Sequence, residues 1–446
     1  MISIAIGDIR HNPDHAWLTL QGGTLLPGLK GAIYEPSASP SALVEERITL
    51  SLRGTHAEMN EVLMRLNDKL ALSQRSLHEQ VGCPIYLRAK AEAAGGYYYT
   101  RILQAHLEPH ANSLSYFSTG SLRFDIVFTR TNSFTSDEIL LPLSNSSQSR
   151  VTNGLALVNH DDSAHDNAFL VDMEDVSTML PAPVRIELMN TYASGQLKDL
   201  FIGSLQYNTF GWLPQLVYEG EAGSGGSTIS STAASNSAYQ RHSWSASGWS
   251  PLTTWTLAAD DLAAFQGRTV LPMLRLANVH AYSDLRLKLS VGSGSMRLFE
   301  GGEVPSLAGM GYMAFPPLRL PCGELLGLSY PSPQLLQLQV YKPGSTSYTL
   351  DIDDLLLIPQ DSFSQHLGLV PLAQGDLLMD DAFEGLSYSL YGGYELGTHI
   401  ALNSGHALQP SHSACFMVFQ GDGSSLAPID RSLAVLAWYR QCRRIL

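Results

Sequence analysis

Charge is what this sequence has least of. Only 15% of its 446 residues are Asp, Glu, Lys or Arg, against roughly a quarter in an average domain, while 44% are hydrophobic. Much of the surface must therefore be neutral or buried against another molecule. Contacts between subunits are the simplest way to bury such a surface, so the composition favours a protein that assembles with copies of itself.

Positive charge is particularly scarce. Lys and Arg together number 27 and Asp and Glu 41, which gives a formal net charge of −14. Proteins that bind nucleic acid tightly neutralise its phosphates with a basic surface, so stable binding of DNA or RNA is not expected. An acidic wall that DNA merely passes is still compatible with this charge, because like charges repel.

The sequence is also poor in cysteine and in long apolar runs. Cys83, Cys322, Cys415 and Cys442 form no C-x-x-C pair, so we expect reduced, mostly buried thiols rather than a zinc cluster or a disulfide framework. No apolar run approaches the ~20 residues that span a bilayer. The N-terminus lacks the basic start and apolar core of a signal peptide. These features predict synthesis in the cytoplasm and no membrane insertion.

Motifs of catalysis are absent as well. The sequence contains no G-x-S-x-G nucleophile turn and no G-x-x-x-x-G-K-[ST] phosphate loop. His78-Glu79 begins an H-E-x-x-H zinc motif, but Gly82 occupies the place of the second histidine. We therefore predict that the protein is not an enzyme and carries no cofactor.

The first part of the chain, residues 1–145, is predicted to be a β-sandwich or barrel with one packed α-helix. Apolar residues at helical spacing indicate a helix from Thr55 to Leu77, and Thr55 with Glu58 forms a T-x-x-E capping box at its start. The stripe expected to face the sheet consists of Met59, Val62, Leu63, Leu66 and Leu70. Strands are expected at Trp17–Leu20, Ile48–Leu52, Pro84–Lys90, Tyr97–Leu107 and Ser121–Thr131.

Short strands separated by Gly and Pro dominate the rest of the sequence. After a polar boundary at Leu143–Arg150, residues 151–359 have the pattern of a β-sandwich of the jelly-roll type. Its clearest strands are Val184–Leu188, Val270–Leu276, Leu285–Val291, Leu335–Val340 and Leu355–Ile358. Residues 220–238 are rich in Gly, Ser and Thr and are predicted to be a flexible loop. Residues 360–446 form a smaller C-terminal β segment that stands alone or completes one of the other domains.

Two acidic clusters could hold a cation or be ordinary surface. Asp161, Asp162 and Asp166 are candidate metal ligands, but clustered Asp residues are also common in turns. Asp351, Asp353 and Asp354 fall in a strand pattern whose alternation predicts that Ile352 and Leu355 point inward and the carboxylates outward. The simpler interpretation of both clusters is structural, so no metal is predicted.

Aromatic and acidic residues of the middle segment suggest an alternative function. Exposed tryptophans hold sugar rings in many β-sandwich modules, although Trp is more often a core or interface residue. The candidates for glycan binding are Trp212, Trp244, Trp249 and Trp255. A glycosidase would also need two carboxylates across a cleft; Glu174, Asp175, Asp380 and Asp381 are possible members. A glycan-binding or glycan-degrading, depolymerase-like protein is therefore the alternative hypothesis.

The order of elements resembles the tail proteins of tailed bacteriophages, especially the distal tail and tail-tube families. The resemblance lies in ERITLSLRG at Glu46–Gly54, the helix through Arg75, and the stretches PIYLRAK, YYYTRILQAHLEP and SLRFDIVFTRTNSF. It covers about a third of the chain. LPAPVRIELMN at Leu180–Asn190 and LDIDDLLLIP at Leu350–Pro359 resemble a carbohydrate-binding-module-like jelly roll, and SLAVLAWYRQCRRIL resembles the last strand of such tail proteins.

The resemblance implies a structural component of the virion tail with no catalytic residues. Such proteins form rings around the DNA channel, so the implied partners are copies of the same chain and other tail proteins. A hexameric ring is favoured, and a trimer with pseudo-six-fold symmetry is the alternative. DNA would pass through without stable binding, and a host surface glycan is a possible further partner. Whether the ring stacks into a tail tube or stands once at the distal end is left open.

Overall fold

The computed structural model describes residues 3–7, 17–37, 41–78, 85–92, 95–110, 120–159, 167–191, 200–209, 211–232, 234–265, 267–278, 284–293, 296–305, 311–320, 334–367, 372–383, 386–391, 394–395, 400–403, 405–420 and 431–444. The chain divides into two compact units. Unit 1 consists of Met1–Ile139, Thr178–Ala182 and Arg440–Leu446, and unit 2 of Leu140–Ser177 and Pro183–Tyr439.

Unit 1 is built on a strongly connected antiparallel sheet. Its strands lie in the order β3-β4-β7-β6-β5-β1-β2, and β8 also pairs with the start of β6. The bounds are β1 (Ser3–Gly7), β2 (Leu18–Gln21), β3 (Leu29–Tyr34), β4 (Leu43–Arg53), β5 (Ile85–Lys90), β6 (Tyr98–Pro109), β7 (Ser121–Thr131) and β8 (Phe134–Leu140). The five strands predicted for this part are confirmed, and β1, β3 and β8 add to them.

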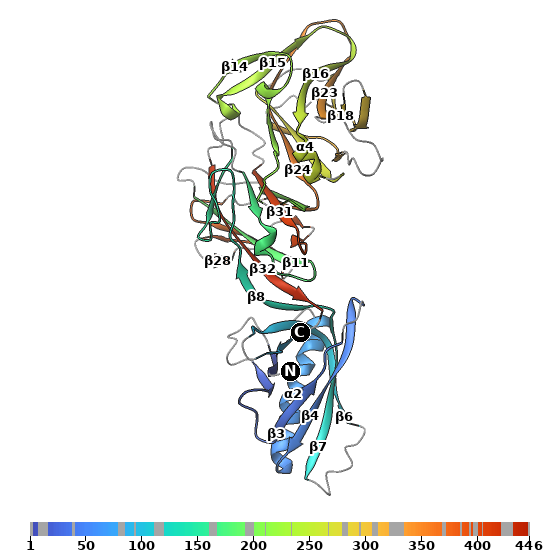
Figure 1. The fold of residues 1–446 in the computed structure, drawn as a ribbon, viewed down its shortest axis with the longest axis vertical. Coiled ribbons are helices and arrows are strands. Elements are labelled where there is room, and N and C mark those ends of the chain that lie inside the picture. Colours follow the sequence, from blue (N-terminus) through green and yellow to red (C-terminus); the bar gives the residue numbers. More distant parts are fainter. Residues whose placement is uncertain are drawn as a thin grey trace. The chain divides into compact units, whose positions relative to one another are not determined.

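Helix α2 (His56–His78) shares one apolar core with this sheet, and Figure 1 shows it running along the strands. Met59, Val62, Leu66 and Leu70 are at most 1% exposed, and Leu63 is partly buried against the same core, so the predicted stripe is confirmed. The capping box is also present. The Thr55 backbone N–H donates to Glu58 Oε2 at 2.7 Å, and the Glu58 N–H donates to Thr55 Oγ1 at 3.3 Å.

The two end strands of this sheet, β2 and β3, are linked by a side chain. Gln21 Oε1 accepts a hydrogen bond from the backbone N–H of Ala32 at 3.2 Å. Gly31, at φ +150°, leaves the space that this amide occupies, because a Cβ atom there would lie 2.5 Å from Gln21 Oε1. β3 thus has backbone pairing to β4 on one side and a side-chain contact on the other.

Unit 2 contains two sheets that combine strands from early and late parts of the chain. One has the order β9-β32-β11-β26-β27-β28, with β30 also beside β11, and the other has the order β10-β31-β12-β25-β29. The bounds are β9 (Leu155–Asn159), β10 (Ala168–Val171), β11 (Ala182–Asn190), β12 (Leu200–Tyr207), β25 (Ser362–Leu367), β26 (Leu377–Asp381), β27 (Leu386–Tyr391), β28 (Tyr394–Glu395), β29 (Ile400–Asn403), β30 (Ala407–Leu408), β31 (Ser413–Gln420) and β32 (Arg431–Arg443).

Two further sheets of unit 2 come from the segment between β12 and β25. One has the order β14-β15-β24-β17-β21, with β13 and β22 at its side, and the other has the order β16-β23-β18-β19, with β20. The bounds are β13 (Val217–Glu219), β14 (Ser227–Ser230), β15 (Ala238–Trp244), β16 (Gly248–Leu257), β17 (Thr269–Leu276), β18 (Arg286–Ser293), β19 (Met296–Glu300), β20 (Val304–Pro305), β21 (Gly311–Ala314), β22 (Leu318–Arg319), β23 (Gln334–Lys342) and β24 (Tyr348–Pro359). The short helix α4 (Ala259–Phe265) precedes β17, and both sheets contribute to one core.

The mainly β fold with one long helix is confirmed, whereas the predicted domain boundaries stay predictions. In the strand pairing, the late strands β25, β26, β31 and β32 all join strands between residues 155 and 207. Residues 220–238, predicted to be a loop, differ in part, because β14 pairs there with β15. The mobility of that segment stays a prediction. Among the described helices, none has the length and apolar character needed to cross a membrane.

Leu66→Asp should unfold unit 1. The side chain is fully buried in the shared core, and an unpaired carboxylate there costs several kcal/mol, a large part of the ~5–15 kcal/mol that stabilises a typical domain. Leu72→Asp is the matched control, because Leu72 lies on the same helix and is 40% exposed. Hydrogen exchange of the β4 and β7 amides measures the effect; equal protection in both variants would show that α2 does not form this core.

Candidate functional site: a buried ion pair in unit 1

Unit 1 contains a buried ion pair between Glu46 on β4 and Arg130 on β7. The register places Val44 opposite Arg130 and Glu46 opposite Phe128, so the two charged residues are diagonal neighbours. Both project to the core-facing side, where Ile48 and Phe128 also lie. The side chains are 3% and 0% exposed.

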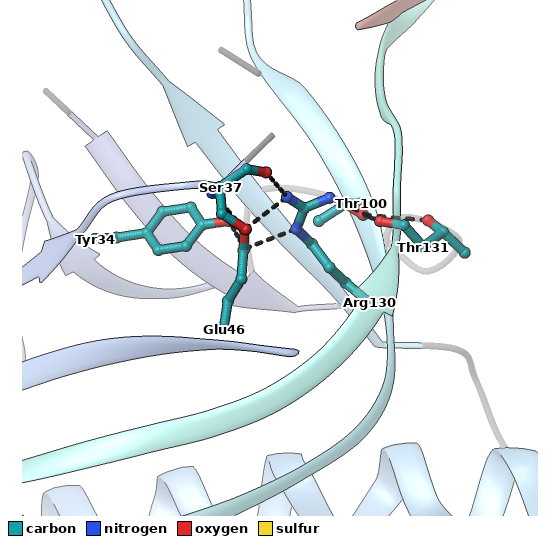
Figure 2. Close-up of polar contacts among 6 residues, drawn as sticks. All are labelled: Tyr34, Ser37, Glu46, Thr100, Arg130 and Thr131. Atoms are coloured by element: carbon teal, nitrogen blue, oxygen red, sulfur yellow. Dashed lines mark hydrogen bonds and ion pairs between the residues drawn. The ribbon is translucent and has the colours of Figure 1, made fainter. Parts of the chain in front are cut away.

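Hydrogen bonds occupy nearly every polar atom of this pair (Figure 2). Arg130 donates from Nε to Glu46 Oε2 and from Nη2 to Glu46 Oε1, each at 2.7 Å. Tyr34 donates its hydroxyl to Oε2, and the Ser37 backbone N–H donates to Oε1 at 2.7 Å. The remaining Arg130 nitrogen, Nη1, donates to the Thr131 carbonyl oxygen at 2.7 Å, while Nη2 also donates to the Ser37 carbonyl oxygen at 3.2 Å.

The pKa values show how the surroundings hold both charges. Burial alone would raise the pKa of Glu46, but hydrogen bonds from Arg130, Tyr34 and Ser37 together lower it. Burial would lower the pKa of Arg130, but the bond to Glu46 and the nearby Tyr34 and Glu46 groups together raise it. Burial, followed by the nearby Glu46 carboxylate, raises the pKa of Tyr34 well above its ordinary range, so the phenol stays a neutral donor.

A carboxylate with this many donors is not available as a base or nucleophile. The network instead fixes backbone, since Ser37 follows β3 and is bonded to side chains from β4 and β7. Thr100 on β6 extends it by donating to the Thr131 carbonyl oxygen at 3.3 Å. The site therefore locks four strands, and it supports no chemistry of its own.

Unit 2 contains a second buried polar cluster, around Asp380 and two histidines. His366 Nε2 lies 2.9 Å from Asp380 Oδ2, while His406 Nε2 lies 3.7 Å from the same oxygen. His406 is also within hydrogen-bond distance of two hydroxyls, Ser362 Oγ at 2.6 Å from Nδ1 and Ser364 Oγ at 3.0 Å from Nε2. Burial lowers the pKa of His406. Burial alone would raise the pKa of Asp380, but the bond to His366 and the nearby imidazoles together lower it.

This cluster does not have the geometry of a Ser-His-Asp triad. A triad histidine bonds serine through one ring nitrogen and the carboxylate through the other, whereas His406 uses both nitrogens on serines. Ser362 is 8% exposed and Ser364 is 0% exposed, so neither hydroxyl is accessible to a substrate in this conformation.

The four tryptophans predicted to bind glycan occupy different settings. Trp255 is 1% exposed in the core and donates to the Glu219 carbonyl oxygen at 2.8 Å. Trp212 is partly buried against the same core. Trp244 stacks on Tyr348, and Trp249 has Lys288 Nζ 4.2 Å from its ring centroid. Glycan binding by these residues stays a prediction.

The acidic candidates that the structure describes occupy different settings. Asp161, Asp162 and Asp166 lie outside the described residues. Asp175 is paired with Arg150 at 2.6 Å, and Glu174 is its neighbour in a 3-10 turn at Met173–Asp175. Asp380 belongs to the histidine cluster, and Asp381 is 6% exposed beside it on β26. The described part of the chain holds no group of three or more His, Cys, Asp or Glu arranged to bind a metal ion.

The outward orientation predicted for Asp351, Asp353 and Asp354 was wrong. All three are at most 7% exposed, because β24 has strands β15 and β17 on its two sides and is covered on both faces. Asp351 accepts hydrogen bonds from Arg241 Nε and Nη2, each at 2.8 Å. Asp353 Oδ2 lies 2.9 Å from Arg275 Nη1. Burial raises the pKa of Asp353 to about 7 despite Arg275.

Two of the four thiols lie among the described residues. Cys415 and Cys442 are free and buried, and burial raises the pKa of both, that of Cys442 to about 11. Thiols of this kind are poor nucleophiles at neutral pH.

Comparison with known proteins gave distant structural matches alone. No family model matches the sequence, and no curated protein matches it significantly. Two structures of the phage p2 baseplate in its activated conformation, one with Sr and one with Ca, match at a TM-score of 0.25 and 12% identity, over 46% of this chain and 72% and 73% of theirs. The SPP1 Dit protein, described as a paradigm of the hub adsorption apparatus in phages that infect Gram-positive bacteria, matches at a TM-score of 0.24 and 8% identity, over 99% of this chain and 89% of its own. TM-scores this low do not establish a shared fold.

Arg130→Met should destabilise unit 1 by about 3–5 kcal/mol, because it leaves Glu46 buried without its cation. The double variant Glu46→Leu with Arg130→Met should recover most of this loss, since no charge then remains in the core. Arg65→Met is the control, because the Arg65–Glu61 pair is more than half exposed and should change stability by less than about 1 kcal/mol. Urea unfolding monitored by exchange of unit 1 amides gives the three values; a single variant as stable as the control would contradict the role of the pair.

The same pair predicts a loss of stability in acid. The pKa of Glu46 is lower in the folded chain than its ordinary value, so its contribution is present above the unfolded pKa of about 4.3 and is lost as pH falls through the folded value. The stability difference between the wild type and the double variant should accordingly shrink below about pH 4. A difference that is constant from neutral to acid pH would mean that Glu46 is not ionised in the fold.

Proposed function

We propose that this chain is a structural protein of a bacteriophage tail that assembles with copies of itself into a ring, either at the distal end of the tail or as the repeating unit of its tube. One observation carries the self-assembly. Unit 1 leaves five large apolar side chains exposed among the described residues: Ile33 (65%), Leu43 (53%), Met64 (67%), Leu72 (40%) and Met179 (67%). Such surface is typically covered by a partner.

Two of these residues lie on neighbouring strands at one end of the sheet. Ile33 is on the end strand β3, and Leu43 begins the neighbouring strand β4. Within the described sheet β3 has backbone pairing to β4 alone, and Gln21 of β2 bonds to the backbone N–H of Ala32 on its other side. The exposed side chain of Ile33, rather than the strand backbone, is therefore the surface that a second subunit would cover. The phage identity rests on the sequence resemblance of residues 1–145 and not on the distant structural matches.

The polar interior supports a structural role in a different way. The buried charges of the Glu46–Arg130 pair are fully engaged in holding strands together, so the surface is where this unit would act. On the outward side of the sheet, Arg47 is paired with Glu108 at 2.6 Å and lies 3.8 Å from Asp125. An arginine neutralised in this way offers little attraction to a passing phosphate backbone.

The assembly is tested by imaging and by one matched pair of variants. Purified wild-type protein should form rings in negative-stain electron microscopy, with six subunits favoured over three. Ile33→Ser should weaken self-association roughly tenfold or more by sedimentation, as loss of an apolar contact at an interface does. Met189→Ser, at a 36% exposed position of unit 2, should leave it unchanged. A monomeric wild type at all concentrations would overturn the proposal, and release of reducing sugar from bacterial surface glycans would favour the depolymerase hypothesis.

Assembled rings should show no tight, salt-sensitive affinity for duplex DNA. With a net charge of −14, the protein lacks the excess of cations whose counterion release makes binding fall steeply with salt. A fluorescence anisotropy titration from low to physiological ionic strength measures this. Tight binding with a steep salt dependence would exclude a passive conduit.

A further inference from the structure

Arg88 lies on the side of β5 that faces away from the core, close to two aromatic rings. Leu87 and Ala89 point into the core, whereas Arg88 is half-buried on the opposite side of the strand. Its guanidinium carbon lies 4.4 Å from the ring centroid of Trp17 and 4.4 Å from that of Tyr97. A cation at this distance from two aromatic rings is favourable for each contact.

Three segments of the chain build this arrangement. Ala5 on β1 and Tyr99 on β6 are the residues directly opposite Arg88. The ring centroid of Trp17 is 5.9 Å from that of Tyr99. Lys90, two residues along β5, places its Nζ 5.5 Å from the ring centroid of Tyr97 and adds a second positive charge.

Arg88 has no carboxylate partner among the described residues, whereas several other arginines do. Ion pairs to Asp or Glu are formed by Arg47, Arg65, Arg130, Arg150 and Arg241. Within the described part of the chain, Arg88 makes no ion pair or hydrogen bond, and its Nε atom is buried without an acceptor. The residue as a whole is half-buried, so the Nη edge of the guanidinium is the part left to bind an acceptor.

The chemistry of this edge selects a carboxylate. The edge of a guanidinium presents parallel N–H donors at the spacing of the two oxygens of Asp or Glu. Trp, Tyr and Arg are also the residue types concentrated at the energetic centres of protein interfaces. Because the chain has 41 acidic against 27 basic residues, a second copy brings an excess of carboxylates to such a cation.

We propose that Arg88, which contacts the rings of Trp17 and Tyr97, binds a side-chain carboxylate of a second copy of this chain at a contact between subunits. The inference rests on the proposed self-assembly and names Arg88 as a positively charged residue of the interface between subunits. This contact is separate from the exposed side chain of Ile33. Ile33 lies on β3, which pairs with β4, whereas Arg88 lies on β5.

The first experiment compares self-association of the full-length wild type with two variants by sedimentation. Arg88→Met keeps an unbranched side chain between the rings but removes the charge, and should weaken association roughly tenfold or more. Arg65→Met is the control, because Arg65 already pairs with Glu61 in its own chain, and should associate as the wild type does. Thermal unfolding of the dilute variants establishes that both are folded.

The second experiment locates the acceptor and remains informative if Arg88→Met fails to fold. Arg88→Lys places a reactive amine at this position, and a carbodiimide should join it by an amide bond to an Asp or Glu of another chain, with loss of water. Mixing unlabelled and ¹⁵N-labelled protein distinguishes a crosslink between chains from one within a chain by peptide mass spectrometry. An interchain crosslink at position 88 supports the proposal.

The outcomes separate this inference from the proposed function. A wild type that assembles while Arg88→Met assembles equally well, or a crosslink at position 88 formed exclusively within one chain, overturns the role of Arg88 and leaves self-assembly standing. A wild type that is monomeric at every concentration overturns both.

Discussion

The burial of the Arg130–Glu46 ion pair is the constraint on which unit 1 depends most. Removing two charges from water costs several kcal/mol per ion, and the attraction between them compensates only if the remaining donors and acceptors are also bonded. In this chain that condition brings Tyr34 and Ser37 to the same carboxylate. The path of the backbone after β3, and the placement of β3 beside β4, are therefore tied to the ionisation of one glutamate.

In both units the buried polar groups described above are bonded to one another and hold strands together. We therefore expect binding to involve groups at the surface. In unit 2, His406 is enclosed between Ser362 and Ser364, and Asp380 is engaged by His366. In the described part of unit 1, the groups that remain open include the apolar side chain of Ile33 on an end strand and the guanidinium of Arg88. One supplies apolar area and the other a directed charge, which together are what a specific interface between subunits requires.

The sequence-based predictions succeeded for elements with one buried face, whose apolar residues recur at a single spacing. They failed for a strand that is buried on both faces. The α2 stripe from Met59 to Leu70 was recognised because its spacing matches a single covered face. Asp353 and Asp354 were misplaced because alternation assumes that one face of a strand is exposed, whereas β24 is enclosed on both. The sequence-based predictions missed the Glu46–Arg130 pair. Glu46 occupies the same face of its strand as Ile48, and Arg130 the same face as Phe128. Opposite charges at two such core-facing positions are a signal for a buried pair.

By itself, the sequence determined the mainly β class, the helix with its capping box, most strands of unit 1 and the shortage of positive charge, because these are properties of contiguous residues or of composition. Only the tertiary structure decided which strands are neighbours, as in the placement of β32 between β9 and β11 and of β25 beside β12 across the long segment between them. It also decided that Trp17, Arg88 and Tyr97 meet. The physical reason is that strand pairing and side-chain clustering depend on contacts between distant segments, and no local pattern specifies which of many similar strands will supply the partner.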